Sequence, residues 1–118
     1  MASGFEDPTD VVITNNRANR TWEALLDDEL VGVVVYENVS ATRLALTHAA
    51  IEEHHRKHGI GTKLISTMLD DIREKHQTVT VWCTAVVDFL EKHPEYRDLV
   101  DPTDPGRAPV AEWEGLTK

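Results

Sequence analysis

The stretch from residue 43 to residue 83 holds the strongest secondary-structure pattern of the chain, a helix between two strands. Apolar residues recur at helical spacing and predict a helix from about Ile60 to Lys75. The runs before and after it, residues 43–51 and 79–83, have the composition of strands. Two strands joined through a helix are expected to lie parallel, with a right-handed connection. This segment therefore predicts a sheet with at least one parallel pair.

Three further strands are predicted before this unit, at residues 11–14, 21–26 and 30–37, with polar turns between them. In the strand 43–51, alternation predicts two faces, with Leu44, Leu46 and His48 on one and Arg43, Ala45, Thr47 and Ala49 on the other. A second helix is predicted at about residues 85–92, bounded by Pro94, and residues 95–100 add one more turn. The expected fold class is α+β, a mostly antiparallel mixed sheet with late helices in the order β-β-β-β-α-β-α.

The ends of the chain predict less structure than its centre. Residues 1–10 are polar and contain Gly4 and Pro8, so they are expected to form a flexible arm. Residues 11–100 form the expected domain. Residues 101–118 are rich in proline and glycine and are expected to be an irregular tail, which Trp113 could dock onto the domain.

Composition narrows the partners that the chain can have. With 118 residues, one domain is expected, and a formal charge of −9 with no Lys/Arg run disfavours nucleic acid. Such an acidic surface favours a cationic acceptor such as an amine. No apolar stretch is long enough for a membrane helix, the N-terminus lacks signal-peptide character, and one cysteine, Cys83, excludes an internal disulfide. We therefore expect a cytoplasmic protein with no membrane contact.

Two glycines at the start of the predicted helix, Gly59 and Gly61, are the main chemical signal. Free N–H groups of a first helical turn point outward beside the positive end of the helix dipole, which suits a phosphate. Glycine leaves that backbone open to a ligand, and Arg56, Lys57 and Lys63 add positive charge. A tight turn without ligand is the alternative interpretation of the same glycines.

The pattern Arg56-x-x-Gly59-x-Gly61, placed after a strand that ends at Ile51, resembles the acetyl-CoA motif of GNAT N-acetyltransferases. A narrower resemblance over residues 11–100 points to a small, minimal GNAT-like family of roughly 100 residues. That family commonly has Cys-Pro-Phe where this chain has Cys-Thr-Ala at 83–85. The matching residues are Asn15-Asn16, Tyr36, Leu46-Thr47-His48, His55-Arg56, Gly59-Ile60-Gly61, Cys83 and His93-Pro94-Glu95-Tyr96.

The resemblance implies a binding mode for acetyl-CoA and an open acceptor side. The backbone of Ala49, Ala50 and Ile51 would pair with the pantetheine arm like an added strand. The thioester would lie where the two parallel strands splay apart. The connection 15–20 has no room for the acceptor-side helices of full-size members, so a large acceptor such as a protein Lys or terminus is expected. The pyrophosphate would be bound by the amides of His58, Gly59, Ile60, Gly61, Thr62 and Lys63, beside Arg56 and Lys57.

Two side chains at the ends of the parallel strands are candidates for catalysis. Cys83 precedes a predicted helix, whose dipole is expected to lower the pKa of the thiol, so it could act as nucleophile or acid. The alternative is a buried, structural cysteine. His48 is a candidate base, with a hydrogen-bonded structural histidine as the alternative. Tyr96 could supply an acid but is favoured as a cap or core contact.

Three histidines close to the glycine motif raise the question of a metal. His54, His55 and His58 lack a cysteine or patterned carboxylate that would complete a site, so no metal is expected. Glu52 and Glu53 are interpreted as a solvated loop face.

The resemblance implies an N-acetyltransferase that moves an acetyl group from acetyl-CoA to an amine. A non-catalytic acyl-CoA-binding or protein-interaction module is the first alternative, and it is favoured by the missing acceptor-side helices. An α+β interaction domain without ligand is the second.

Overall fold

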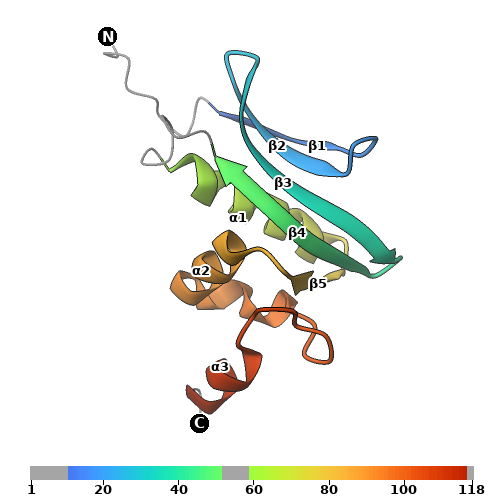
Figure 1. Ribbon diagram of the computed structural model, residues 1–118, viewed down its shortest axis with the longest axis vertical. Helices are drawn as coiled ribbons and strands as arrows, with labels where there is room; N and C mark the ends of the chain where they lie inside the picture. The colour runs from blue at the N-terminus through green and yellow to red at the C-terminus, as the bar shows by residue number, and fades with distance from the viewer. Residues whose placement is uncertain (1–10, 52–58, 117–118) are drawn as a thin grey trace.

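The computed structural model describes residues 11–51 and 59–116, and nearly every predicted element is present (Figure 1). Strands 21–26 and 43–51 have the predicted bounds, and the main helix ends at Glu74, one residue early. The element order β-β-β-β-α-β-α is confirmed. The elements are β1 Val12–Asn16, β2 Thr21–Leu26, β3 Glu29–Ser40, β4 Arg43–Ile51, α1 Ile60–Glu74, β5 Thr78–Val81, α2 Thr84–Lys92, the 3-10 helix η3 Pro94–Leu99 and α3 Val110–Leu116.

The five strands form one mixed sheet in the order β1-β2-β3-β4-β5. The first four are antiparallel, and β4 and β5 are parallel, as predicted. The β2–β3 turn places Asp27 and Asp28 at positive φ, 52° and 69°, which matches the right-handed twist of a tight hairpin. Among the described residues, no helix is long and apolar enough to cross a membrane.

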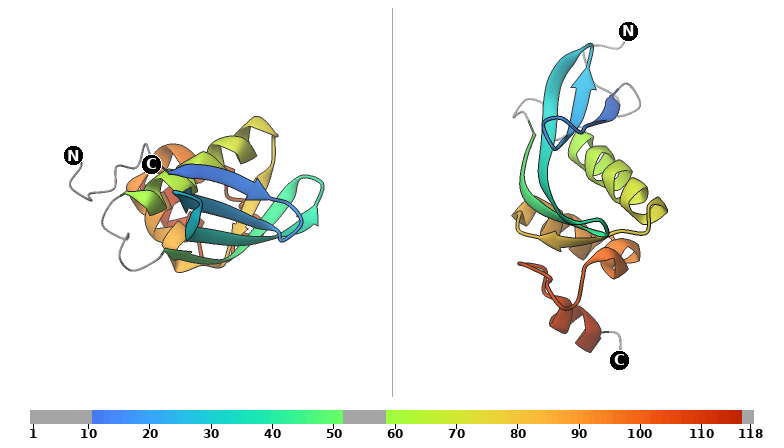
Figure 2. Two further views of the ribbon diagram at one scale, coloured as in Figure 1. Left: turned by 90° about the horizontal axis from the view of Figure 1, so that it is seen from above. Right: turned by 90° about the vertical axis from the view of Figure 1, so that its right-hand side faces the viewer.

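Helix α1 covers one face of β1–β3 (Figure 2). Its apolar stripe is buried there, as its spacing predicts, and it packs against core residues of β2 and β3 such as Ala24 and Val34. Full burial of an aliphatic side chain of this kind contributes about 1.5–3 kcal/mol to stability. The sheet and α1 thus form the rigid frame on which β4, β5 and α2 are placed.

Strand β4 contains a bulge that the alternation of its residues did not reveal. Val35 of β3 pairs with His48, but the next residue, Tyr36, pairs with Leu46, so Thr47 is the extra residue. Cross-strand partners share a face. Leu46 pairs with Tyr36 and Ala49 with Val34, and both partners are buried in the core, so Leu46 and Ala49 lie on the α1 face. The prediction that His48 shares a face with Leu44 and Leu46 is therefore wrong, because the bulge reverses the phase of the strand. His48 lies on the opposite face and is exposed.

The segment after η3 is more ordered than the predicted irregular tail. Its backbone pairs with the outer edge of β5, where the Asp101 amide donates to the Val79 carbonyl at 2.9 Å and the Arg107 amide to the Val81 carbonyl at 2.6 Å. Trp113 in α3 is buried, with the Arg97 guanidinium 4.7 Å from its ring centre. The segment 101–116 therefore protects an edge that would otherwise be open.

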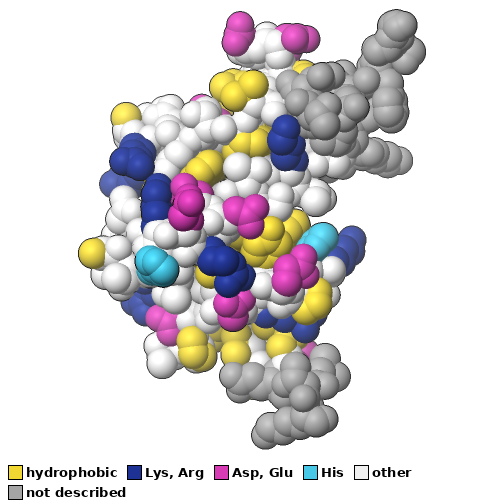
Figure 3. Space-filling view, turned by 180° about the vertical axis from the view of Figure 1, so that it is seen from behind, with side chains coloured by type: hydrophobic (Ala, Val, Ile, Leu, Met, Phe, Trp, Pro, Cys, Tyr) yellow, Lys and Arg dark blue, Asp and Glu magenta, His cyan; other side chains and the backbone are white. Residues whose placement is uncertain are grey.

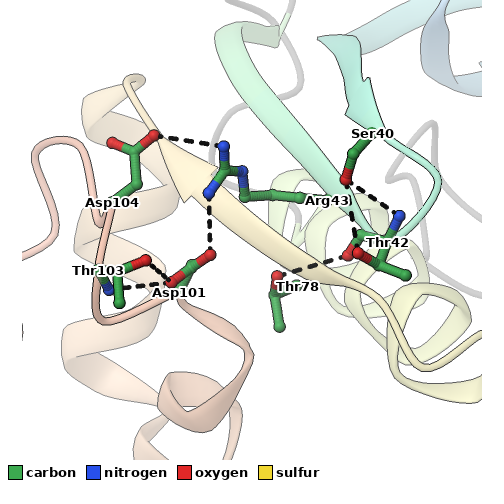
Figure 4. A network of polar contacts seen from close by, with 7 residues as sticks. All are labelled: Ser40, Thr42, Arg43, Thr78, Asp101, Thr103 and Asp104. Carbon is green, nitrogen blue, oxygen red and sulfur yellow. Dashed lines mark hydrogen bonds and ion pairs between the residues drawn. The ribbon is translucent and has the colours of Figure 1, made fainter.

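Polar contacts fix the start of this segment to the sheet (Figure 4). The Arg43 guanidinium lies 3.0 Å from the Asp101 carboxylate and 3.6 Å from that of Asp104. Hydrogen bonds from Thr103, together with Arg43, lower the pKa of Asp101 to about 2. The Asp101 carboxylate is thus ionised at neutral pH and holds β4 and the segment together.

Candidate active site

Strands β4 and β5 separate half-way along β4. Their pairing ends at Leu46 and Val81, with one last bond from the Trp82 amide to the Leu46 carbonyl at 2.9 Å. Strand β4 continues to Ile51, and among the described strands residues 48–50 pair only with β3. The backbone polar groups of residues 48–50 that point away from β3 could therefore pair with a ligand in extended conformation.

A cleft of about 380 Å³ lies between this strand edge, the start of α1 and helix α2. Two of its walls contain residues that were predicted to bind acetyl-CoA, Ala49–Ile51 in β4 and Gly59 with Gly61–Thr62 at the start of α1. Helix α2 supplies the third wall. The side chains there are Ala85, Asp88, Phe89 and Lys92, followed by His93.

Gly59, the residue before α1, has a left-handed conformation with φ 78°. A side chain is disfavoured at this φ, so glycine is required for the chain to enter the helix in this way. No side chain caps the helix at Gly59. The amides of Ile60, Gly61 and Thr62 precede the first bond of the helical ladder and have no intrahelical acceptor. They face the cleft end of the helix, where a phosphate would be stabilised.

Lys63 does not take the place that was predicted for it. Its amide already donates to the Gly59 carbonyl at 3.0 Å, and its ammonium donates to the Val11 carbonyl at 2.8 Å. The predicted set of pyrophosphate-binding amides therefore loses Lys63, because this residue is inside the helical ladder and ties α1 to the start of β1. Arg56, Lys57 and His58, and the histidines 54 and 55, lie outside the described residues.

Cys83 lies at the start of α2 and is buried, with 7% of its surface exposed. Burial raises the pKa of its thiol, although the backbone N–H groups of Val86 and Ala85 act in the opposite direction. The expectation that the helix dipole lowers this pKa is therefore wrong, because loss of solvation outweighs the helix terminus. Cys83 is not among the described residues that line the cleft.

This raised pKa predicts a slow, pH-dependent alkylation of Cys83. At neutral pH the thiol is protonated, so iodoacetamide should modify the folded protein far more slowly than the urea-unfolded protein, in which the same cysteine is exposed. Mass spectrometry of the intact protein measures both rates. Rapid modification of the folded protein that is constant from pH 6 to 9 would instead reveal a stable thiolate.

A family comparison decides what kind of protein this cleft belongs to. Residues 21–99 match the family model of the GCN5-related N-acetyltransferases (GNAT), a segment that runs from β2 to η3 and contains the whole cleft. The chain belongs to the GNAT family. A comparison with curated proteins found no significant match.

Three solved structures that resemble the chain are each less than 25% identical to it in sequence. Ard1 from Thermoplasma volcanium is 23% identical, with 55% of this chain and 45% of that chain covered and a TM-score of 0.49. A GNAT family acetyltransferase from Elizabethkingia anophelis, with acetyl-CoA bound, is 15% identical, with coverage of 69% and 60% and a TM-score of 0.46. The aminoglycoside acetyltransferase meta-AAC0020 from an uncultured soil metagenomic sample, in complex with sisomicin, is 24% identical, with coverage of 65% and 55% and a TM-score of 0.47. The chain thus spans about half of the length of these proteins.

The described residues of this GNAT chain fit the chemistry of acetyl-CoA. The edge of β4 offers backbone N–H and C=O groups to an amide-containing arm, and the open turn at Gly59 offers amides to a phosphate. The ammonium group of Lys92 adds a positive charge on the opposite wall of the cleft. The pantetheine arm and the pyrophosphate of an acyl-CoA would thus each meet complementary groups.

Helix α2 carries the cleft residues that sequence reasoning missed. Asp88, Lys92 and His93 bring titratable groups into the cleft, and the His93 ring stacks on Phe89 with 4.2 Å between ring centres. Their spacing was visible in the sequence, because residues 85, 88, 89 and 92 form one stripe of a helix. Nothing in the sequence showed that this stripe faces the glycine motif.

Tyr96 has the structural role that was favoured for it. Its hydroxyl donates to the Asp70 carboxylate at 2.8 Å, and its ring lies 5.6 Å from that of Phe89. Burial and the neighbouring Asp70 raise the pKa of Tyr96 to about 12. Within the described part of the chain, no group of three His, Cys, Asp or Glu side chains could hold a metal ion.

Proposed function

We propose that this GNAT protein is an N-acetyltransferase that moves an acetyl group from acetyl-CoA to an amine. The observation that carries the proposal is the cleft between β4, where it has separated from β5, and the first turn of α1. Family membership supports the same reaction class.

The backbone would bind acetyl-CoA in two places. Ala49, Ala50 and Ile51 would pair with the pantetheine arm, and the amides of Gly59 to Thr62 would bind the pyrophosphate, with Lys92 across the cleft. Arg56, Lys57 and His58 remain expected contributors from the segment before Gly59. This arrangement would direct the thioester toward the point where β4 and β5 separate.

The reaction forms a C–N bond and breaks the C–S bond of the thioester. A neutral amine attacks the acetyl carbonyl, its surplus proton passes to a base, and the departing thiolate takes up a proton. His48, exposed on the sheet face away from α1, is the proposed base for an amine that arrives from that side. Burial keeps the Cys83 thiol neutral, which disfavours it as an acyl-accepting nucleophile; because it does not line the cleft, it would act as proton donor only if the thiolate reaches the start of α2.

Release of CoA thiol in the presence of amines and Lys peptides tests this function. We expect turnover that depends on the acceptor, and a fall of kcat by about 10²-fold in His48→Ala, the usual contribution of a general base. The affinity for acetyl-CoA should be unchanged in that variant. His76→Ala, at the far end of α1, is the matched control and should keep full activity.

A non-catalytic acyl-CoA-binding module is the second candidate, and the short β1–β2 connection favours it. Residues 17–20 form only a turn between these strands, with no helix over the thioester end of the cleft. If acetyl-CoA binds but no acceptor releases CoA above the background rate, this second function replaces the first.

A further inference from the structure

The sheet has one face that no described helix covers. Figure 2 shows α1 on one side of β1–β3 and only strands on the other. The α1 side of the molecule carries acidic and basic side chains mixed together (Figure 3). The strand register assigns the residues of this open face, because cross-strand partners share it. Its three rows are Val12–Leu25–Leu30, Thr14–Glu23–Val33–Ala50 and Asn16–Thr21–Val35–His48.

Six of the eleven residues in these rows are apolar, and five of these six, all but Ala50, are Val or Leu. Val12 and Leu30 are 61% and 50% exposed, and Leu25, Val33 and Val35 are half-buried only by one another and by the strands. Adjacent exposed apolar residues on one surface are typical of a contact site rather than of a solvated face.

Glu23 places one negative charge in the middle of this apolar surface. Its carboxylate accepts hydrogen bonds from the Thr21 hydroxyl at 2.8 Å and from the Asn16 amide group at 3.2 Å. Both donors are neutral, and no Lys, Arg or His of the described chain lies within ion-pair distance of Glu23. The carboxylate is thus held in a fixed orientation while its charge stays available to a cation.

The register also fixes the distance from Glu23 to the proposed reaction site. Glu23 pairs with Val33, and Val33 pairs with Ala50, which lines the cleft. With strands about 4.8 Å apart, Glu23 is about 10 Å from the β4 edge. His48 ends the neighbouring row of the same face. A cation bound by Glu23 is therefore too far from the thioester to react, but it can hold a molecule whose amine reaches His48.

We infer that the open face binds the acceptor, a polypeptide segment with a reacting Lys or N-terminus and a second basic residue about three positions away. In an extended chain, three residues span about 10 Å, which matches the distance from Glu23 to the β4 edge. The apolar rows favour a polypeptide over a free polyamine, because a polyamine would leave Leu25, Val33 and Val35 uncovered. The claim that the bound segment is acetylated rests on the proposed function. The claim that it binds rests only on the open face.

A blocked pentapeptide, Val-Lys-Ala-Val-Arg, tests the inference by NMR titration of the ¹⁵N-labelled full chain. We expect shifts of the β1–β3 backbone amides, and binding about tenfold tighter than for the same peptide with norleucine in place of Arg, as expected for a hydrogen bond to a charged group. Glu23→Gln should abolish this preference. Glu29→Gln removes the same charge from the other face of the β2–β3 hairpin, and this variant should keep the preference for the Arg peptide.

Other outcomes overturn the inference. Equal binding of both peptides, a preference that survives Glu23→Gln, or shifts confined to other surfaces would exclude the assigned role of Glu23. Spermidine that binds as tightly as the Arg peptide would show a polyamine site instead. A dimer in sedimentation that buries Val12 and Leu30 would show that a second copy covers the face. The peptide titration is done without acetyl-CoA. A protein that binds the peptide but not acetyl-CoA would therefore contradict the proposed function and leave the assignment of the open face intact.

Discussion

Gly106→Ala is expected to release residues 101–116 from β5 and to lower the free energy of unfolding by about 3 kcal/mol. Gly106 has φ 68°, and a Cβ there would clash with the backbone of Val81, lying 2.8 Å from its carbonyl carbon. The clash is with backbone, so no rotamer change relieves it. Relief requires breaking the bonds that join the segment to β5, such as that from Arg107 to Val81. Backbone strain together with the loss of buried contacts is one of the mechanisms by which single substitutions lower stability most.

Urea unfolding measures the loss, and hydrogen exchange of the Arg107 amide shows whether the segment has left the sheet. Gly61→Ala is the matched control, because a Cβ at Gly61 meets only the side chain of Ile51, at 3.4 Å. At that helical position alanine is also the better helix former. Stability of Gly106→Ala equal to that of Gly61→Ala, with the Arg107 amide still protected, would show that the segment is not anchored as described.

Phe89→Ala is expected to cost about 3–4 kcal/mol of stability and to weaken binding of acetyl-CoA. The Phe89 ring is 6% exposed, stacks on His93 and packs near Tyr96, so its removal leaves a cavity between α2 and η3. The same ring lines the cleft, and its loss frees His93 from a fixed position. Thermal unfolding and a titration with acetyl-CoA measure the two effects.

Phe89→Leu separates volume from aromatic stacking. Leucine fills most of the space, so we expect less than half of the stability loss, while His93 still loses its stacking partner. Wild-type stability in Phe89→Ala would contradict the packing of α2 described above.

The order of the elements and the place of the cleft could be predicted because both depend on local patterns. The stripe of α1 and the glycines at 59 and 61 are signals that a few neighbouring residues carry. The stripe predicts the helix, and the glycines predict where it begins after the preceding strand. The cleft follows from these local elements, since a parallel pair that separates leaves one strand edge open.

Other features depend on contacts between distant residues, and local patterns could not reveal them. One extra residue at Thr47 reverses the faces of β4, and no alternation rule shows which residue of a strand will bulge. The pKa of Cys83 depends on how deeply the start of α2 is buried. The pairing of Gly106 with Val81 joins segments that are far apart in the sequence, so a proline-rich composition gave only an irregular tail.

Calorimetric titration of acetyl-CoA into the wild type and Gly59→Glu tests the central claim most directly. A carboxylate at the first turn of α1 would occupy and repel the pyrophosphate, so we expect saturable binding in the wild type and at least tenfold weaker binding in the variant. Asn19→Glu adds the same charge to the exposed β1–β2 turn and should bind like the wild type. Circular dichroism confirms that each variant is folded. Absence of binding in the wild type, or equal binding in folded Gly59→Glu, would contradict the assignment of this cleft to acetyl-CoA.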